Sequence, residues 1–472
     1  KPMKALFIAA LVLLKLAACG DSSDRSTPEP DYEPIPAAVL EAPPDAGAAF
    51  IQSVSFNLSK VGYTAEEFFV RGTASSFIPV TEAGTDGLWQ VEPLDRADYL
   101  TRIVVHRPGN AADFSGTVIV EWLNVSGGLD ASPGYVAGHT EIHRAGHAWV
   151  GVSAQVVGIE GRPGGFPLNL KAVNPARYGD LLHPGDQYSY DMFAQVAGLL
   201  RQPGTPDPLR GLRPEYIVAL GESQSAFRLT TFINALQLYY DPFDGYHLYS
   251  RGGSGAPLQP EGGGIDTPGA QRIRADLNVP VLTFQAETDL LGLGYLPARQ
   301  DDSTNFRLWE VAGTAHADVY TVITGTGDAR GAPEFAEIAE ISELAGFIKC
   351  DKPFNAGPMH YVINASLRAL DDWIRTGSAP PPAPRLNVND DGSDFLRDEF
   401  GNATGGIRTP HVDAPAATLR GDGNGGGGFC FLFGTTELFS PALMASLYVD
   451  ADGYTNAVRE AARDAVARGH LL

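Results

Sequence analysis

The feature that most constrains the fold is an alternation of strand-like and helix-like segments that begins near Thr101. Short runs rich in β-branched and aromatic residues are typical of buried strands, whereas apolar residues three or four apart predict an amphipathic helix. A chain that alternates the two predicts an α/β fold with a mainly parallel sheet flanked by helices. The expected strands are RIVVHRP (102–108), TVIVEWL (117–123), HAWVGVSAQ (147–155), YIVAL (216–220), PVLTFQ (280–285) and RLWEVAG (307–313), and the expected helices span 187–202, 225–238 and 365–377.

The stretch YIVALGESQSA (216–226) joins one of these strands directly to a helix. Gly221 and Ser225 stand two residues on either side of Ser223, and both are small, as a tight strand-to-helix turn requires. Such a turn holds the serine hydroxyl at the carboxyl edge of a parallel sheet, where ligands bind in open α/β folds. The G-x-S-x-S spacing therefore predicts a nucleophile elbow of the α/β-hydrolase type, next to a helix amino terminus that favours developing negative charge.

Two further strand ends supply the partners that a nucleophilic serine needs. Glu287 and Asp289 follow the strand 280–285, and His316 follows the strand 307–313. The chain order of serine, acid and histidine is that of α/β-hydrolases. We expect His316 to take the proton of the serine hydroxyl and Asp289 to orient the imidazole, with Glu287 as the alternative acid.

The oxyanion formed in acyl transfer needs two backbone N–H donors. We expect one donor to be Gln224, the residue after the nucleophile. The other is expected at Asn124 or Val125, because the loop NVSGG (124–128) has glycines that let the backbone approach a ligand closely. These residues predict ester hydrolysis through an acyl-enzyme, with no metal or organic cofactor. An amidase or an acyltransferase with the same residues, and a non-catalytic binding protein on a hydrolase fold, are the alternatives.

Five longer segments also carry a family resemblance: VIVEWLNVSGGLD (118–130), HPGDQYSYDMF (183–193), GESQSAFRLTTFINA (221–235), RLWEVAGTAHAD (307–318) and GNATGGIRTPHVDAP (401–415). Together they resemble the bacterial "α/β hydrolase domain" family, large serine hydrolases that are regarded as carboxylesterases. The resemblance covers roughly residues 53–454. It implies Ser223 as nucleophile, His316 as base and an acid within 287–289, but it implies no particular substrate.

The first 47 residues are interpreted as a targeting signal followed by a tether, and not as part of the fold. The apolar run ALFIAALVLL (5–14), followed by small residues up to Cys19, resembles a lipoprotein signal peptide (1–19) with Cys19 as the lipidated residue. The run is shorter than the roughly 20 residues that span a bilayer. Residues 20–47, rich in proline, serine and acids, predict a disordered tether. We therefore expect an exported protein, anchored to a membrane only by its lipid and facing the periplasm or the exterior.

Export also bears on the remaining cysteines. Cys350 and Cys430 are left as a pair if Cys19 carries a lipid, and an oxidising compartment permits a disulfide between them. Two unrelated buried thiols are the alternative.

Composition limits the partners and the number of domains. The net charge of −22 argues against nucleic acid, which is bound through clustered Lys and Arg. We expect a small-molecule ester substrate, and the sequence leaves the oligomeric state open. Residues 48–472 are expected to form one elaborated α/β-hydrolase domain with a core at 95–375, a carboxyl-terminal extension at 376–472 and lid-forming insertions at 158–184, 251–267 and 378–428.

Two motifs leave alternatives open. NVNDDGSDFLRD (387–398) partly matches a calcium loop, but it begins with Asn387 and ends with Asp398, so a plain loop is favoured. Arg408 either reaches the cleft to bind a substrate carboxylate or pairs with a surface acid, and the second interpretation is favoured.

Overall fold

The computed structural model describes residues 32–163, 167–260, 267–344, 346 and 348–472. The predicted signal peptide and its Cys19 lie outside these residues. Within the described ranges, no helix has both the length and the apolar character needed to cross a membrane.

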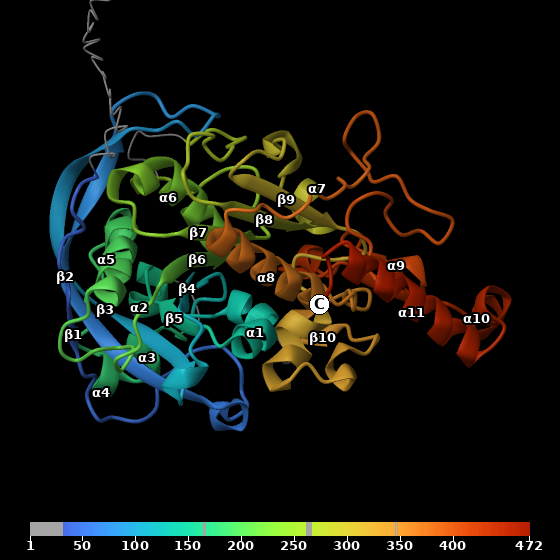
Figure 1. The fold of residues 1–472 in the computed structure, drawn as a ribbon, viewed down its shortest axis with the longest axis horizontal. Coiled ribbons are helices and arrows are strands. Elements are labelled where there is room, and N and C mark those ends of the chain that lie inside the picture. Colours follow the sequence, from blue (N-terminus) through green and yellow to red (C-terminus); the bar gives the residue numbers. More distant parts are fainter. Residues whose placement is uncertain (1–31, 164–166, 261–266, 345, 347) are drawn as a thin grey trace, which may run out of the picture. The chain divides into compact units, whose positions relative to one another are not determined.

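Among the described residues, a nine-stranded sheet forms the centre of the fold (Figure 1). The strand order is β1-β2-β3-β5-β4-β6-β7-β8-β9. The pairs from β5 to β9 in this order are parallel, as the alternation predicted, whereas the pairs among β1, β2, β3 and β5 are antiparallel. The strands are β1 (Val39–Glu41), β2 (Tyr63–Pro79), β3 (Val91–Pro108), β4 (Thr117–Trp122), β5 (Ala148–Val152), β6 (Tyr216–Glu222), β7 (Gly245–Tyr249), β8 (Val281–Ala286) and β9 (Phe306–Val311).

Helices cover both faces of the sheet (Figure 1). Successive side chains of a strand point to opposite faces, so Val118 of β4 packs with Phe193 and Phe232, and Ile119 packs with Val362 on the other face. The two faces thus bury separate apolar clusters, and the fold is the predicted α/β arrangement. The helices are α5 (Ser189–Arg201) and α6 (Gln224–Tyr240) on the first face and α1 (Pro133–Ala145) and α8 (His360–Thr376) on the second.

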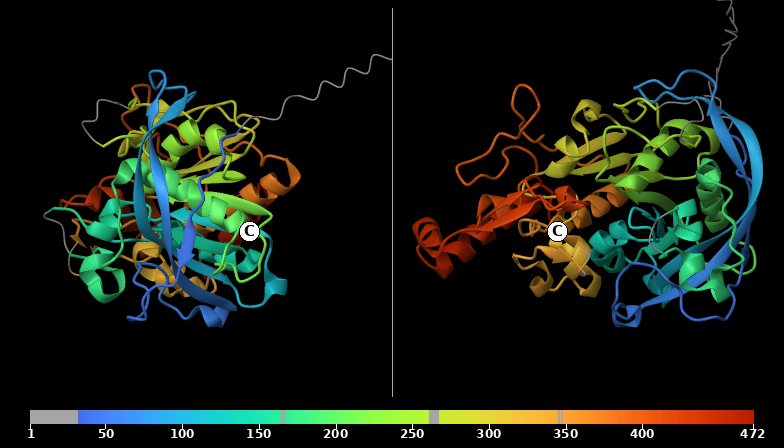
Figure 2. Two further views of the ribbon diagram at one scale, coloured as in Figure 1. Left: turned by 90° about the vertical axis from the view of Figure 1, so that its left-hand side faces the viewer. Right: turned by 180° about the vertical axis from the view of Figure 1, so that it is seen from behind.

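β2 and β3 form a long, bent antiparallel ribbon (Figure 2). β1 adds to this ribbon, with Leu40 opposite Val70, and the Leu40 side chain is buried in the core. Arg177 donates to the backbone oxygen of Pro44 at 2.7 Å and so holds the chain that follows β1. The prediction of a disordered tether up to residue 47 is therefore wrong for residues 39–41, because the proline-rich composition hides a short apolar strand.

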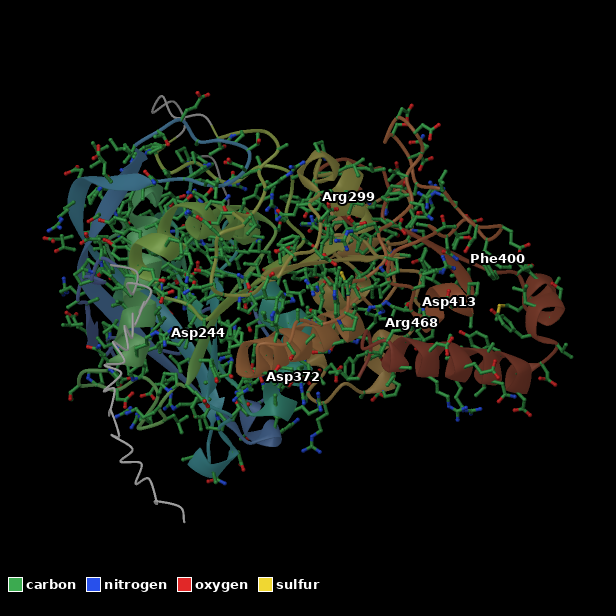
Figure 3. The ribbon with its side chains drawn as sticks, turned by 45° about the horizontal axis from the view of Figure 1, so that its top comes forward. Asp244, Arg299, Asp372, Phe400, Asp413 and Arg468 are labelled. Carbon is green, nitrogen blue, oxygen red and sulfur yellow. A yellow bond between two sulfur atoms is a disulfide. The ribbon has the colours of Figure 1, made fainter. Side chains whose placement is uncertain are left out.

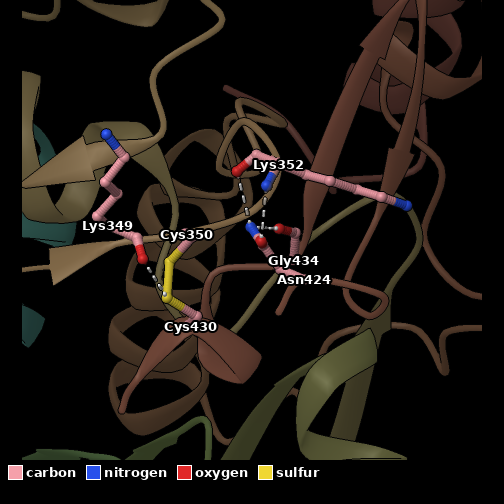
Figure 4. The surroundings of a disulfide bond; sticks show 6 residues. All are labelled: Lys349, Cys350, Lys352, Asn424, Cys430 and Gly434. Atoms are coloured by element: carbon pink, nitrogen blue, oxygen red, sulfur yellow. Dashed lines mark hydrogen bonds between the residues drawn. A yellow bond between two sulfur atoms is a disulfide. The ribbon is translucent and has the colours of Figure 1, made fainter. Parts of the chain in front are cut away.

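The carboxyl-terminal region is joined to the rest by a disulfide between Cys350 and Cys430, whose Cα atoms are 5.5 Å apart (Figure 4). Asn424 links the same two segments, because its Nδ2 donates to the backbone oxygens of Lys352 at 3.1 Å and Gly434 at 2.7 Å. The remaining elements are α2 (Val156–Glu160), α3 (Leu170–Val173), α4 (Pro175–Tyr178), α7 (Glu287–Leu291), β10 (Glu343–Leu344), β11 (Ile348–Lys349), α9 (Pro410–Asp413), β12 (Ala417–Arg420), β13 (Thr435–Leu438), α10 (Pro441–Tyr448) and α11 (Ala451–Ala467).

Candidate active site

Ser223 lies in the sharp turn between β6 and α6. Its backbone has φ 52° and ψ −118°, a region that a residue with a side chain adopts only when its surroundings hold it there. A Cβ on Gly221 would lie 2.8 Å from Leu229 Cδ1 and 3.0 Å from the carbonyl carbon of Ser225, so the turn requires glycine at this position. The N–H of Ser223 donates to the backbone oxygen of Tyr249 at 2.9 Å, which ties the turn to β7.

Ser223, His316 and Asp289 meet at the carboxyl ends of β6, β9 and β8. Ser223 Oγ is 2.9 Å from His316 Nε2, and His316 Nδ1 is 2.7 Å from Asp289 Oδ1. Because a carboxylate only accepts, Nδ1 carries the proton and Nε2 is left to accept from the serine hydroxyl. The N–H of Ala286 donates to Asp289 Oδ2 at 2.6 Å and fixes the carboxylate. In this geometry the imidazole can remove the proton of the serine hydroxyl.

The surroundings of His316 favour its charged form. Burial is the largest influence on the pKa of His316 and lowers it. The hydrogen bond and charge of Asp289 and the charge of Glu222 act in the opposite direction and prevail, so the pKa of His316 is raised above its ordinary value. An imidazolium that forms during a reaction is therefore stabilised here.

Glu287, the alternative acid, is fully buried and binds backbone groups away from His316. Its oxygens accept from the N–H of Gly313 at 2.6 Å and from the N–H of Gly421 at 2.9 Å. Burial raises its pKa to about 7, although these two hydrogen bonds oppose the shift. Of the two predicted acids, Asp289 is thus the one in contact with His316, and Glu287 connects the loop before His316 to the carboxyl-terminal region.

The predicted oxyanion donors differ in availability. The N–H of Gln224 opens α6, where the first N–H groups have no partner inside the helix. The N–H of Asn124 donates to the backbone oxygen of Ala131 at 2.9 Å, so this predicted donor is already used. The N–H of Val125 faces the side-chain oxygen of Gln224 at 3.5 Å, a long hydrogen bond that a substrate oxygen can replace. Asn124 is therefore the less available of the two residues predicted for the second donor.

A cavity of about 300 Å³ lies beside Ser223 and His316. Four apolar residues near the disulfide line one side of the cavity. We call them the roof: Ile348, Phe429, Leu432 and Phe433. Among the described residues, neither Lys nor Arg lines the cavity, and none of the lining comes from the segments 158–184, 251–267 or 378–428. The described parts of the insertions predicted to form lids therefore do not line this cavity, and residues around the disulfide line it instead.

The two motifs with open alternatives are engaged in local contacts. Arg408 binds Asp398 at 3.1 Å and Asp413 at 2.6 Å (Figure 3 labels Asp413), so it pairs with acids and stays away from the cavity lining. In the segment 387–398, the side-chain oxygen of Asn389 accepts from a backbone N–H of its own loop at 2.9 Å. Over the part of the chain that the structure describes, His, Cys, Asp and Glu form no group of three or more that could hold a metal.

One residue of the site escaped sequence reasoning. Glu222, the residue before Ser223, lines the cavity, and its Oε1 is 3.4 Å from His316 Nε2. The available signal was a charged residue at the end of an otherwise apolar strand, directly beside the predicted nucleophile.

The fold agrees with the family comparison. The chain belongs to the α/β hydrolase domain family, whose model matches residues 33–472. Comparison with curated proteins gave no match.

Several solved structures show a distant likeness. A fungal esterase from Rhizomucor miehei is 11% identical over 65% of this chain and 86% of its own, with a TM-score of 0.30. Esterase Est22 is 14% identical over 57% of this chain and 77% of its own, with a TM-score of 0.30. A putative dienelactone hydrolase from Klebsiella pneumoniae is 14% identical over 51% of this chain and 85% of its own, with a TM-score of 0.25. At these values the likeness carries no residue role or substrate to this chain.

Proposed function

We propose that this α/β hydrolase is a serine esterase that cleaves carboxylic esters through an acyl-enzyme on Ser223. The observation that carries the proposal is the line of contacts from Ser223 Oγ to His316 Nε2 at 2.9 Å and from His316 Nδ1 to Asp289 at 2.7 Å. His316 takes the serine proton as the oxygen attacks the ester carbonyl, and the N–H groups of Gln224 and Val125 receive the oxyanion.

The second half of the reaction uses the same groups. Protonated His316 gives its proton to the departing alcohol, which leaves the acyl group on Ser223. A water molecule then loses a proton to His316 and attacks the acyl carbonyl, so the acid is released and the serine hydroxyl is restored.

The cavity supports an ester with an uncharged, apolar acyl group. Its volume of about 300 Å³ is at the lower end of small-molecule sites, which favours short or medium acyl chains. The roof supplies aromatic and aliphatic surface, and among the described residues that line the cavity Glu222 is the one carboxyl. A free carboxylate on the substrate would therefore meet a like charge and no cation.

The test is hydrolysis of p-nitrophenyl esters graded from acetyl to palmitoyl by the full chain, with Ser223→Ala as the matched control. We expect an optimum at short or medium chains, and turnover at the background rate in the variant. A serine-directed phosphonate should label the wild type at Ser223 and leave the variant unlabelled. A folded wild type that neither turns over an ester nor takes the label would refute the proposal, and acyl transfer to an added alcohol that far exceeds hydrolysis would indicate an acyltransferase.

We also propose that the protein is exported and anchored by a lipid on Cys19. The Cys350–Cys430 disulfide supports export, because such bonds persist in oxidising compartments. Mass spectrometry of the mature amino terminus tests the anchor: a diacylglyceryl cysteine at Cys19 is expected, and an unmodified amino terminus that includes Cys19 would contradict it.

A further inference from the structure

Glu222 places a second carboxyl at the histidine of the site. It is the last residue of β6, its side chain is 8% exposed, and its Oε1 lies 3.4 Å from His316 Nε2. Its Oε2 accepts from Asn124 Nδ2 at 2.8 Å, and the same Nδ2 also reaches the backbone oxygen of Glu222 at 3.3 Å. Asn124 therefore aims this carboxyl at the ring nitrogen that faces Ser223.

The groups around Glu222 let it titrate near neutrality. Burial is the largest influence and raises the pKa of Glu222 to about 7; the charge of His316 lowers it, the charge of Asp289 raises it and the hydrogen bond from Asn124 lowers it. Glu121 of β4 also acts on it: burial raises the pKa of Glu121 to about 8, although its oxygens accept from the N–H groups of Gly134 and Tyr135 and from the ring N–H of Trp149.

Tyr249 of β7 is a further titratable group near Glu222. Burial raises its pKa well above the ordinary tyrosine value, so its hydroxyl stays protonated. The strongest charges that act on Glu222 are those of Asp289 and, when it is protonated, His316.

We propose that Glu222 is a positioning residue that acts through His316: its carboxylate stabilises the imidazolium from the Nε2 side, as Asp289 does from the Nδ1 side. The inference rests on the proposed esterase function. With neutral His316, the carboxylate faces the lone pair of Nε2 and the two repel. Once Nε2 has taken the proton of Ser223, the new N–H lies within reach of both the substrate oxygen and Glu222 Oε1.

The proton balance leaves Glu222 unchanged over one cycle. The proton moves from Ser223 Oγ to His316 Nε2 and then to the alcohol oxygen, and Glu222 forms and breaks no covalent bond. Its charge favours the first transfer, because the imidazolium is the product of that step. The same charge raises the pH at which His316 becomes an unprotonated base.

The decisive variant is Glu222→Gln, which keeps an oxygen for Asn124 and removes the charge. We expect the pKa of His316 to fall by about one unit, a typical effect of one close charge. The acidic limb of kcat/KM should then move about one unit to lower pH, and kcat at the optimum should fall about tenfold. Glu222→Asp keeps the charge and should restore at least part of the shift in the pH profile.

Asp318→Asn is the matched control, because Asp318 is a buried carboxyl two residues after His316 whose oxygens accept from Thr321 and Met359. The pKa of His316 should stay within about 0.3 unit in this variant, since a carboxyl that does not face the ring changes little.

A substrate-free measurement separates the inference from the esterase proposal. The ring-proton resonance of His316 can be followed against pH in the full chain. In the wild type it should show two steps, one from His316 and one from Glu222, and in Glu222→Gln one step at lower pH. The inference is overturned if the pKa of His316 is unchanged in Glu222→Gln. If Glu222→Gln does not fold, a single titration step in the wild type overturns it instead. Missing ester turnover together with a shifted His316 pKa would instead remove the esterase proposal alone.

Discussion

Replacing Asp289 by asparagine should lower kcat for ester hydrolysis by about 10⁴-fold, or about 5.5 kcal/mol of activation free energy. The reason lies in the proton on His316. The N–H of Ala286, 2.6 Å from Asp289 Oδ2, remains a donor in the variant, so the amide oxygen must turn toward it. The amide NH₂ then faces His316 Nδ1, which has to accept. The ring proton moves to Nε2, and Nε2 can no longer accept from the hydroxyl of Ser223.

The matched control is Glu287→Gln, which alters the other buried carboxyl beside the loop of His316. The N–H groups of Gly313 and Gly421 bind different oxygens of Glu287, and an amide has an oxygen at only one of those two places, so one buried donor would face an NH₂ group. We expect the free energy of unfolding to fall by about 1–3 kcal/mol, with kcat of the folded variant within about threefold of the wild type.

The assay for both variants is steady-state turnover of the best p-nitrophenyl ester, well above the pKa of His316, together with the rate of phosphonate labelling. Urea unfolding gives the free energy of each variant. The reasoning fails if Asp289→Asn stays within tenfold of the wild type, or if Glu287→Gln loses more turnover than Asp289→Asn does.

Four further predictions concern stability and the cavity. Replacing Cys350 and Cys430 by alanine removes a bond between residues 80 positions apart and should lower the free energy of unfolding by about 4.5 kcal/mol. Urea titrations measure this loss, and a loss below about 1 kcal/mol would contradict the chain-entropy model. Phe429→Ala should raise KM for the longest accepted acyl chain and leave kcat and Tm unchanged, because the ring lines the cavity but is 42% exposed; a fall in kcat would count against this role. Glu222 has its pKa raised from 4.5 to about 7, so the native state keeps a proton that the unfolded state loses, and the wild type loses stability as pH rises through this window. The free energy of unfolding of Glu222→Gln, measured relative to the wild type, should therefore be up to about 3 kcal/mol larger at pH 8 than at pH 4. An equal difference between variant and wild type at both pH values would contradict this prediction. Ser223→Gly should be more stable than Ser223→Ala, with a higher Tm and a free energy of unfolding that is about 1 kcal/mol larger, because a φ of 52° suits glycine. Equal Tm values for the two variants would show that the turn stores no strain.

The parallel part of the sheet could be predicted from the sequence because its strands are buried on both faces and form continuous apolar runs. Each proposed catalytic side chain directly follows such a run. The position of Ser223, His316 and Asp289 in the fold therefore followed from the strand order, once the strand ends of β6, β8 and β9 were identified.

Other elements gave no comparable signal. β2 places two adjacent acids, Glu66 and the buried Glu67, directly before two buried phenylalanines, and so breaks the period-two pattern of a strand. β7 has only five residues, so neither strand stands out from its neighbours. The roof depends on contacts between segments about 80 residues apart, which no local pattern reports. The choice between Asn124 and Val125 depended on a backbone hydrogen bond to Ala131, which only the folded loop determines.

The carboxylate of Glu287 has a consequence for the synthesis of this protein. It joins Gly313, three residues before His316, to Gly421, which lies 134 residues later in the chain than Glu287. Because a chain leaves the ribosome from its amino terminus, the segment with Ser223 is exposed long before that anchor and the roof exist. The newly made core therefore carries an incomplete pocket, and we expect ester turnover only after Gly421 and Phe433 have emerged and the Cys350–Cys430 bond beside the roof has formed.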